Sequence, residues 1–457
     1  MRVAVYLFGD PSHDGRVLRE ARSLAGAGHQ VTLLARLHAE SRGTLPEIPG
    51  VRFVDVPPPA SAWFTVNVIR RPWRLGGWIR ASWAALRHPR PAVLARAVLA
   101  TLLIPWVAVG LAWQRVRPER PDATDSLLDY WLFWRVHVGM WCAAAARRAP
   151  EADVHHAHDL TALPAAVRAA QRGGRIVYDS HEIFLESGRH ARRPGWVRRR
   201  LAAWERRMAQ CAVAVVTVNE GIAAELRTRL SPRRLVVVHN CPPVHRGPFD
   251  PALSVRTRLG LAADVPIALY HGGLSPHRGL EILAAAVREP GMAEVHAVYM
   301  GYGSERATVE RLAADPEAGG RVHLLDAVPP DAVVDSVAGA DVAVMAIAAS
   351  TRNHVLSTPN KLFEALAAGV PPVVSDFPEM RRIVLADLDA PLGAVCDPGS
   401  AASVAGAIGR ILALPAADRA ALRARCLAAS AARWNWEAEV AALLGLYGEL
   451  ATAQVPA

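Results

Sequence analysis

The only lysine of the chain lies in a segment whose side chains could bind a phosphorylated sugar. All other members of the 52 Lys and Arg are arginines, and Lys361 stands in "STPNKLFEALAAG", three residues before Glu364. On a helix of 3.6 residues per turn, Asn360, Lys361 and Glu364 share one face. The free N–H groups and positive dipole end of a helix N-terminus, with a lysine beside them, favour a phosphate. Glu364 could then accept hydrogen bonds from sugar hydroxyls, although an exposed Lys361–Glu364 ion pair would also explain the spacing.

The sequence also marks the two ends of this predicted helix. We expect Thr358 to cap it, Pro359 to occupy its first turn and Gly369 to end it. Ala367 and Ala368 should leave the polar face uncrowded.

Two further segments combine glycines with side chains suited to a nucleotide. In "HGGLSPHRGLEIL", Gly272 and Gly273 allow a ligand to approach the backbone closely. Arg278 can form a bidentate contact with a diphosphate, or it can be an exposed arginine on a turn. "MGYGSE", with Gly301 and Tyr302, is a glycine loop after a strand. No GxGxxG follows the first strand, which counts against a dinucleotide-dependent enzyme.

Two turns in the first half of the chain carry polar residues after a predicted strand. "GDPSHDGRVLRE" places Asp14, Gly15 and Arg16 at the start of a helix, where Asp14 could serve only as the N-cap. "YDSHEIF" ends in His181 and Glu182.

The segment "VHHAHDLTALP" contains three histidines and suggests a metal site at first sight. In a strand, however, His156 and His158 share one face and His155 points to the other, so we expect no metal. His158 and Asp159 should end the strand facing the cleft, with Asp159 or Thr161 capping the next helix. Two strands that both end in His plus a carboxylate indicate a site.

Short apolar runs alternate with helical patterns through most of the chain. This alternation predicts an α/β protein with two Rossmann-like, doubly wound domains that face each other across a cleft. We expect an N-terminal domain over 1–240, a C-terminal domain over 241–423 and a final helix over 424–457 that packs back on the first. The strands are expected in "VAVYLF", "GHQVTLLAR", "VRFVDV", "DVHHAHD", "RIVYDSHE", "CAVAVVTVN" and "RLVVVHN", then in "PIALYHGG", "VHAVYMGYG", "VHLLDAV", "DVAVMAI" and "VPPVVSD".

Residues 58–150 interrupt the first domain with a different composition. Nine of the 13 tryptophans fall there, interleaved with arginines, and residues 97–113 carry no charge but include Pro105 and Gly110. A spanning helix needs about 20 apolar residues, so a basic, Trp-rich segment at a membrane interface fits better. The alternatives are an insertion packed on the host domain and a true span.

The bulk composition limits the partners and the compartment. The net charge of +10 suggests an anionic partner, and the five cysteines show no CxxC spacing, which gives no zinc site and fits a reducing compartment. "MRVAVYLFGD" is typical of a buried strand and not of a signal peptide. We therefore expect a cytoplasmic protein, peripheral at the inner face of the cell membrane if residues 58–150 contact lipid.

In their order along the chain, these segments resemble the retaining glycosyltransferases of family 4, which have the GT-B fold. The matching segments are "DGRVLREARSLAGAGHQVTLLAR", "DVHHAHDLTALPAA", "VYDSHE", "GGLSPHRGLEIL", "GYGSE", "VPPDAVVDSVAGADVAVM" and "STPNKLFEALAAGVPPVVSD". The resemblance covers nearly the whole chain apart from the Trp-rich insertion.

The resemblance implies a role for each candidate residue. Glu364 would bind the ribose of a nucleotide-sugar, Arg278 with Lys361 its diphosphate, and His158 the transferred sugar. No metal or other cofactor is implied, because Arg, Lys and the helix dipole offset the charge of the leaving diphosphate. The donor-binding set would also include Gly272, Gly273, Gly301, Thr358, Pro359 and Asn360, with Tyr302 and Val328 beside the base, and the acceptor-side set would be Gly15, Arg16, Asp159, His181 and Glu182.

The chain departs from the family pattern in two places. The family often pairs two glutamates eight positions apart, and the earlier position is Leu356 here. Gly272 and Gly273 stand where an arginine is common. We hypothesise that Lys361 supplies the positive charge missing there.

These observations predict an enzyme that transfers a sugar from a nucleoside-diphosphate-sugar to a glycan or lipid-linked acceptor, with retention of anomeric configuration. A nucleotide-sugar 2-epimerase of the same fold and a catalytically silent membrane-associated scaffold are the alternatives. Nucleic acid is not an expected partner, because the basic residues lie with Trp in the insertion and not on a known binding module.

Overall fold

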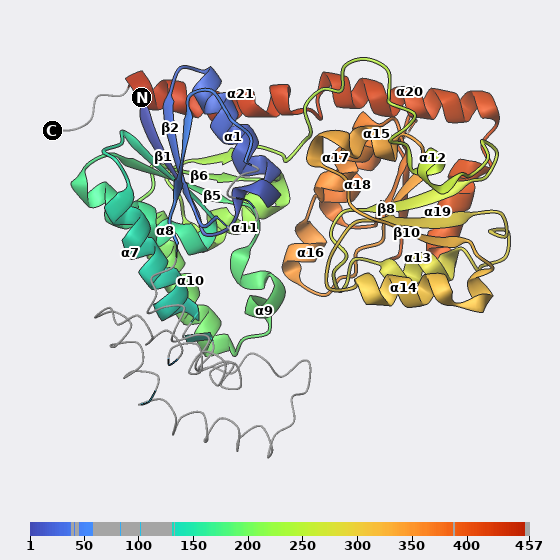
Figure 1. Ribbon diagram of the computed structural model, residues 1–457, viewed down its shortest axis with the longest axis horizontal. Helices are drawn as coiled ribbons and strands as arrows, with labels where there is room; N and C mark the ends of the chain where they lie inside the picture. The colour runs from blue at the N-terminus through green and yellow to red at the C-terminus, as the bar shows by residue number, and fades with distance from the viewer. Residues whose placement is uncertain are drawn as a thin grey trace. The chain divides into compact units, whose positions relative to one another are not determined.

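The computed structural model describes residues 1–37, 41, 45–57, 83, 101, 130–131, 133–386 and 389–452. Within these residues the chain forms two β-sheets with helices packed on them (Figure 1). The strands pair in parallel, which confirms the α/β architecture predicted from the alternation of strands and helices.

The first sheet has seven strands in the order β3-β2-β1-β4-β5-β6-β7. β1 and β4 are neighbours, with Leu7 opposite His158, and the chain proceeds from them in opposite directions along the sheet. A doubly wound sheet binds its ligands at such a switch point, outside the carboxyl ends of the strands. The strands are β1 (Arg2–Leu7), β2 (Gln30–Ala35), β3 (Val51–Asp55), β4 (Val154–His158), β5 (Arg175–Ser180), β6 (Ala214–Thr217) and β7 (Leu235–Val237).

Helix α1 (Gly15–Gly26) follows β1 and shows how the sequence sets a helix start. The Asp14 carboxylate accepts a hydrogen bond from the Val17 N–H at 3.2 Å, so the interpretation of Asp14 as an N-cap is confirmed. Apolar residues at helical spacing bury one face of α1 against the sheet. The other helices of this part are α7 (Gly139–Arg148), α8 (Asp159–Ala169), α9 (Gly188–Ala191), α10 (Gly195–Ala209) and α11 (Glu220–Leu230).

The second sheet has six strands in the order β10-β9-β8-β11-β12-β13. Its switch point lies between β8 and β11. Five strands were predicted, and β13 was missed because its apolar run "AVC" is shorter and contains fewer β-branched residues than the run "LVVV" that revealed β7. The strands are β8 (Ile267–His271), β9 (His296–Met300), β10 (Val322–Leu325), β11 (Val342–Met345), β12 (Pro372–Ser375) and β13 (Ala394–Cys396).

Ten helices accompany the second sheet or follow it in the described residues. The last of them, α21, carries Glu449, whose carboxylate pairs with Arg234 just before β7. The predicted domain boundaries stay predictions. The helices are α12 (Val255–Leu259), α13 (Leu280–Ala286), α14 (Arg306–Ala314), α15 (Val333–Val337), α16 (Arg352–Leu356), α17 (Asn360–Ala367), α18 (Pro378–Val384), α19 (Ala401–Leu412), α20 (Ala416–Ala432) and α21 (Trp436–Thr452).

Most of the Trp-rich insertion lies outside the described residues. Of the uncharged run 97–113, the structure describes residue 101 alone. At the described end of the insertion, Trp141 on α7 is fully buried and packs edge-to-face on Phe8, with ring centroids 5.3 Å apart. Trp131 is 55% exposed. Trp141 is therefore a core residue, and the membrane prediction can concern only other tryptophans of the segment.

Across the described residues, no helix by itself is long and apolar enough to cross a membrane. Ala401–Leu412 and Ala416–Thr452 reach the required length and composition only as a pair, bent by 103°. Residues of both segments lie in the hydrophobic core of the second sheet.

Candidate active site

The glycine loops after β8 and β9 lie directly against each other. The Gly272 N–H donates to the Met300 carbonyl at 2.8 Å, and the Leu274 N–H donates to the Tyr302 carbonyl at 2.8 Å. A Cβ on Gly301 would lie 1.9 Å from the Gly272 carbonyl oxygen, which real atoms do not tolerate. These two loops therefore need glycine for close backbone approach, and they form a bare backbone surface at the end of β8.

Arg278 stands on the loop between β8 and α13, between two residues with left-handed backbone. His277 has φ +66° and Gly279 has φ +81°, where a Cβ would lie 2.3 Å from the Ala346 carbonyl oxygen. Burial, then the charges of Arg278 and His277, lower the pKa of the nearby His354 to about 4. In the described part of the chain no ion pair involves Arg278, so its charge creates a positive field at this loop.

Lys361 lies against the same backbone. Its ammonium is 3.5 Å from the centroid of the Tyr270 ring, and a Cβ built on Gly272 would be 3.5 Å from Lys361 Nζ. Burial, followed by the charge of Arg278, lowers the pKa of Lys361 well below its usual value, while Glu364 acts in the opposite direction. The geometry puts Lys361 beside the glycine where the family commonly has an arginine nearby. Its role as the replacement charge stays a hypothesis.

The start of α17 differs from the prediction. The helix begins at Asn360, Pro359 is the N-cap residue with extended backbone, and no side chain caps it. The prediction that Thr358 caps the helix is wrong, because Pro359 displaces it from the cap and its hydroxyl accepts a hydrogen bond from Asn219 Nδ2 at 3.1 Å. The Asn360 side-chain oxygen accepts from Asn240 Nδ2 at 2.8 Å.

The exit and the packing of α17 are partly as predicted. Gly369 has φ +65° and ends the helix, as its position suggested. Leu362, Phe363 and Leu366 are fully buried, as expected if the face shared by Asn360, Lys361 and Glu364 is the one turned away from the core. Ala367 and Ala368 are also buried, at 3% and 0% exposure, so the prediction that they leave the polar face open is wrong.

Glu364 projects from α17 toward the end of β8. Its Oε2 lies 3.0 Å from Nε2 of His271, the last residue of β8. The Glu364 side chain is 25% exposed, whereas that of His271 is 2% exposed. Sequence reasoning missed His271 because it treated "PIALYHGG" as an apolar strand; a polar residue at the end of a buried strand was the available signal.

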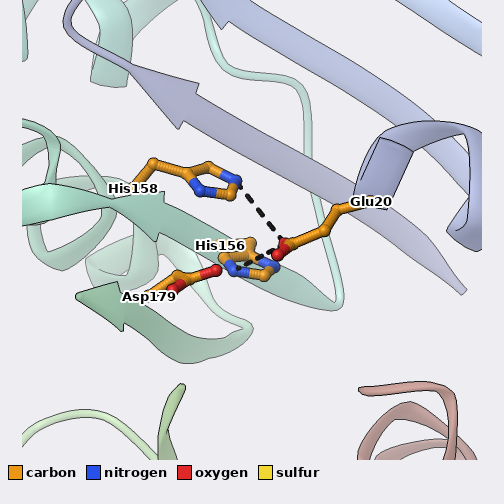
Figure 2. A group of neighbouring side chains, drawn as sticks. All are labelled: Glu20, His156, His158 and Asp179. Atoms are coloured by element: carbon orange, nitrogen blue, oxygen red, sulfur yellow. Dashed lines mark ion pairs between the residues drawn. The ribbon is translucent and has the colours of Figure 1, made fainter. Parts of the chain in front are cut away.

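The end of β4 holds a second cluster, formed by Glu20, His156, His158 and Asp179 (Figure 2), and all four residues are buried. The rings of His156 and His158 stack with centroids 4.7 Å apart and planes at 10°. Glu20 Oε2 lies 3.7 Å from His156 Nε2 and 3.9 Å from His158 Nε2. Arg16 Nε is 2.9 Å from the other oxygen of Glu20, and both side chains are at most 2% exposed.

His155 points to the opposite face of β4, as predicted from strand alternation. Its Nδ1 lies 2.8 Å from the Tyr6 hydroxyl, and its Nε2 lies 3.0 Å from the Gly173 carbonyl. Desolvation lowers the pKa of His155. The sequence pointed to Arg16 and His158 but missed Glu20, whose i,i+4 spacing from Arg16 was the available signal.

The buried cluster at β4 has ligand types that could hold a metal ion. The ligand atoms of Glu20, His156, His158 and Asp179 on β5 all lie within 4.8 Å of one another. Arg16, however, already places a positive charge against Glu20. The charge of this carboxylate is therefore compensated within the protein, and the absence of a metal stays a prediction.

The turn from β4 into α8 is not built as expected. His158 itself is the N-cap residue of α8 and has no side-chain cap bond, so neither Asp159 nor Thr161 occupies the cap. Asp159 has φ +60°, an uncommon value for a residue with a Cβ. His158 is the last residue of β4 and its side chain is buried at 1% exposure, and its expected position facing a cleft stays a prediction.

The remaining predicted residues take diverse positions. Gly15 is the first residue of α1. His181 Nε2 lies 3.8 Å from Asp179 Oδ2, and Glu182 accepts a hydrogen bond from Asn353 Nδ2 at 2.9 Å. Tyr302 is 60% exposed after β9, and Val328 is half-buried after β10. The residues at β8 and α17 thus form one site, and Arg16 and His158 belong to the buried cluster at β4.

The two doubly wound sheets define a GT-B fold, and solved structures share it along nearly the full chain. A sucrose-phosphate synthase from Thermosynechococcus elongatus has a TM-score of 0.67 at 19% identity, covering 99% of this chain and 100% of that chain. The Anabaena protein HepE, in complex with UDP, has a TM-score of 0.62 at 15% identity, again with coverage of 99% and 100%.

The sequence comparisons define the family. The model for glycosyl transferases group 1 matches residues 265–413, which contain β8 and α17, and the model for glycosyltransferase family 4 matches residues 112–246, which contain β4. The chain is thus a glycosyltransferase of the group 1 and family 4 type.

Two relatives carry the same description. A D-inositol 3-phosphate glycosyltransferase from Xylanimonas cellulosilytica is 29% identical over 340 residues, 70% of this chain and 77% of the relative. A D-inositol 3-phosphate glycosyltransferase from Acidothermus cellulolyticus is 31% identical over 229 residues, 47% of this chain and 48% of the relative.

Proposed function

We propose that this glycosyltransferase moves a sugar from a nucleoside-diphosphate-sugar to a glycan or lipid-linked acceptor with retention of configuration. The observation that carries the proposal is the group at the end of β8. There Lys361 lies against Gly272, Glu364 projects beside it, and Arg278 carries a charge that no described carboxylate pairs with. Two cations and an exposed glycine backbone suit a diphosphate.

The nature of the donor is supported by the fold neighbours. The HepE structures contain UDP, UDP with glucose, and UDP-glucose. In this chain, Arg278 and Lys361 would hold the two phosphates, and Glu364 would accept hydrogen bonds from the ribose hydroxyls. Tyr302 and Val328, on the loops after β9 and β10, would lie beside the base.

The chemical step in this proposal is a same-face displacement at the anomeric carbon. The bond from that carbon to the diphosphate oxygen breaks while the acceptor oxygen forms its bond on the same face, and the acceptor proton passes to the leaving diphosphate. Arg278 and Lys361 offset the charge that develops on the leaving group, so the proposal needs no metal. His158 would contact the transferred sugar, and because it is buried, the residues that cover it must move aside.

The proposed acceptor and location rest on the sequence. A basic, Trp-rich segment over residues 58–150 suits contact with an anionic membrane surface, where lipid-linked acceptors of the cell envelope reside. The relatives' description names D-inositol 3-phosphate, and an acceptor of that kind would add a second anionic group to the substrates. The proposed location is accordingly the cytoplasmic face of the membrane.

A thermal-shift screen of the full chain against UDP, GDP, ADP and their sugars tests the proposal. A ligand that binds only the folded state at free concentration L adds RT ln(1 + L/Kd) to the free energy of unfolding and so raises the melting temperature. One nucleotide family should stabilise the chain, and turnover of its sugar should require an acceptor. Turnover without acceptor would favour a 2-epimerase, and no binding of any of these ligands would favour a silent scaffold.

A further inference from the structure

His271 has the geometry of a buried support for an accessible carboxylate. It ends β8 with a 2% exposed side chain, and its Nε2 lies 3.0 Å from Oε2 of Glu364. An ionised carboxylate only accepts hydrogen bonds, so Nε2 must carry the proton and donate. Glu364 is thus held from the strand side while a quarter of its side chain stays open to solvent.

The contact with Glu364 is the one side-chain hydrogen bond that His271 makes among the described residues. Its Nδ1 is buried and has no hydrogen-bond partner among the described residues. His155, by contrast, has a partner for each ring nitrogen, Tyr6 and Gly173. His239 resembles His271 in pairing one nitrogen with a glutamate, Glu439, while the other has no partner among the described residues. Leaving a buried nitrogen unsatisfied is unfavourable, which an apolar residue at the end of β8 would avoid.

Glu364 needs such a support because its side chain is flexible and because no second glutamate stands at position 356. A glutamate has three side-chain torsions, and fixing them before a ligand arrives reduces the entropy lost on binding. Position 356, where a second glutamate is common in the family, is Leu356, which is 6% exposed. Recognition by one carboxylate alone makes its orientation more important.

We infer that His271 is a positioning residue: it fixes the Glu364 carboxylate for the ribose hydroxyls of the nucleotide. A carboxylate can accept about four hydrogen bonds, so the His271 contact leaves acceptor capacity for both hydroxyls. The inference rests on the proposed function, since it assigns Glu364 to the ribose.

Two substitutions separate the hydrogen bond from the space that the ring fills. In His271→Gln the amide nitrogen reaches about as far as Nε2 and can still donate to Glu364. In His271→Asn the amide stops near the level of Nδ1 and cannot reach it. Both variants are polar and smaller than histidine, but they differ from each other by one methylene group, so the comparison of a ribonucleotide with its dideoxy form is needed to separate loss of the contact from a change in packing.

The experiment is a calorimetric titration of the full chain with UDP, GDP and ADP, and then with the 2′,3′-dideoxy form of the tightest binder. We expect His271→Asn to weaken binding of the ribonucleotide about tenfold, in line with a hydrogen bond to a charged group. His271→Gln should retain most of the affinity. The dideoxy nucleotide should bind wild type and both variants equally, because it lacks the hydroxyls that Glu364 would recognise.

The alternative results are distinguishable. The inference is overturned if a variant loses as much affinity for the dideoxy nucleotide as for the ribonucleotide. It is also overturned if His271→Gln and His271→Asn lose the same affinity. Either result leaves the proposed function standing. If wild type binds no nucleoside diphosphate, the proposed function fails and this inference fails with it. A melting curve of each variant confirms that the titrated chain is folded.

Discussion

Charged residues lie at the carboxyl ends of both β8 and β4, but the two sites differ in whether these charges are paired within the protein. At β4 the stacked histidines and the Arg16–Glu20 ion pair are buried, and Arg16 compensates the charge of Glu20 within the protein. At β8, Lys361 lies half-buried on an aromatic ring, and Arg278 has no carboxylate partner in the described chain. Charge at β8 is therefore available to a ligand, whereas charge at β4 mainly stabilises the structure.

The physical reason lies in the desolvation of ions. A buried ion pair is retained only when its members compensate each other, and removal of one member leaves the other unpaired at high cost. A partly buried cation without a carboxylate partner can instead bind an anionic ligand, because that ligand supplies the missing opposite charge. Charged residues are thus expected to stabilise the folded chain at the end of β4 and to bind an anionic ligand at the end of β8.

The largest expected effect is on the buried cluster. Glu20→Ala leaves Arg16 buried without its carboxylate, and we expect a loss of about 3–5 kcal/mol in the free energy of unfolding. Tyr6→Phe is the matched control on the opposite face of β4, where it removes one hydrogen bond from His155 and should lose about 1 kcal/mol. Denaturant unfolding measures both. A Glu20→Ala loss no greater than that of Tyr6→Phe would contradict the account of β4.

Arg278→Ala is the corresponding change at β8. We expect a decrease of about 100-fold to 1,000-fold in kcat, because Arg278 would stabilise the charge on the leaving diphosphate. The free energy of unfolding should change little, since no ion pair is broken. Arg311→Ala on α14, whose side chain bonds only to its own helix, is the control. Wild-type turnover in Arg278→Ala would remove the leaving-group role.

Lys361→Met should separate binding from stability. We expect about tenfold weaker nucleotide binding, as for loss of a hydrogen bond from a charged group. Unchanged affinity and turnover would refute the replacement-charge hypothesis.

Stability should also depend on pH through Lys361. Burial lowers its pKa in the folded chain below 10.5, so between the folded pKa and 10.5 the unfolded chain binds more protons. Stability linked to Lys361 therefore rises with pH across that window. In unfolding curves at several pH values, Lys361→Met should lose this rise while keeping the other pH dependence. An identical slope in both proteins would contradict the burial of this amine.

Metal removal should have the smallest effect. Arg16 compensates Glu20 without an ion, so treatment with a chelator should leave both turnover and melting temperature unchanged. Elemental analysis of the purified chain checks the same point. A stoichiometric metal that is lost in His156→Ala would contradict the account and make Glu20, His156, His158 and Asp179 ligands.

The sequence predicted the fold well because both sheets are buried on two faces. Strands such as β1 and β8 are short apolar runs between helical patterns, which local composition reveals directly. The same reasoning missed β13, whose run "AVC" has one β-branched residue, although it found the equally short β7 in the run "LVVV".

The site was predicted less completely, because its pairings are distant in sequence. His271 meets Glu364 across 93 positions, and Glu20 meets His156 across 136, so neither partner can be found from local spacing. The Thr358 cap failed for a related reason: its hydroxyl is bound by Asn219, 139 positions away. Local rules located the ends of strands and helices, and tertiary contacts decided which side chains act there.

The central claim is that the end of β8 binds the nucleoside diphosphate and that the end of β4 does not. Its most direct test is calorimetric titration of wild type, Arg278→Ala and the folded Glu20→Gln variant with the nucleotide that the thermal-shift screen identifies. We expect Arg278→Ala to weaken binding at least tenfold, as loss of a charged hydrogen bond does, and Glu20→Gln to keep the wild-type Kd. Wild-type affinity in Arg278→Ala, with lost affinity in Glu20→Gln, would contradict the claim.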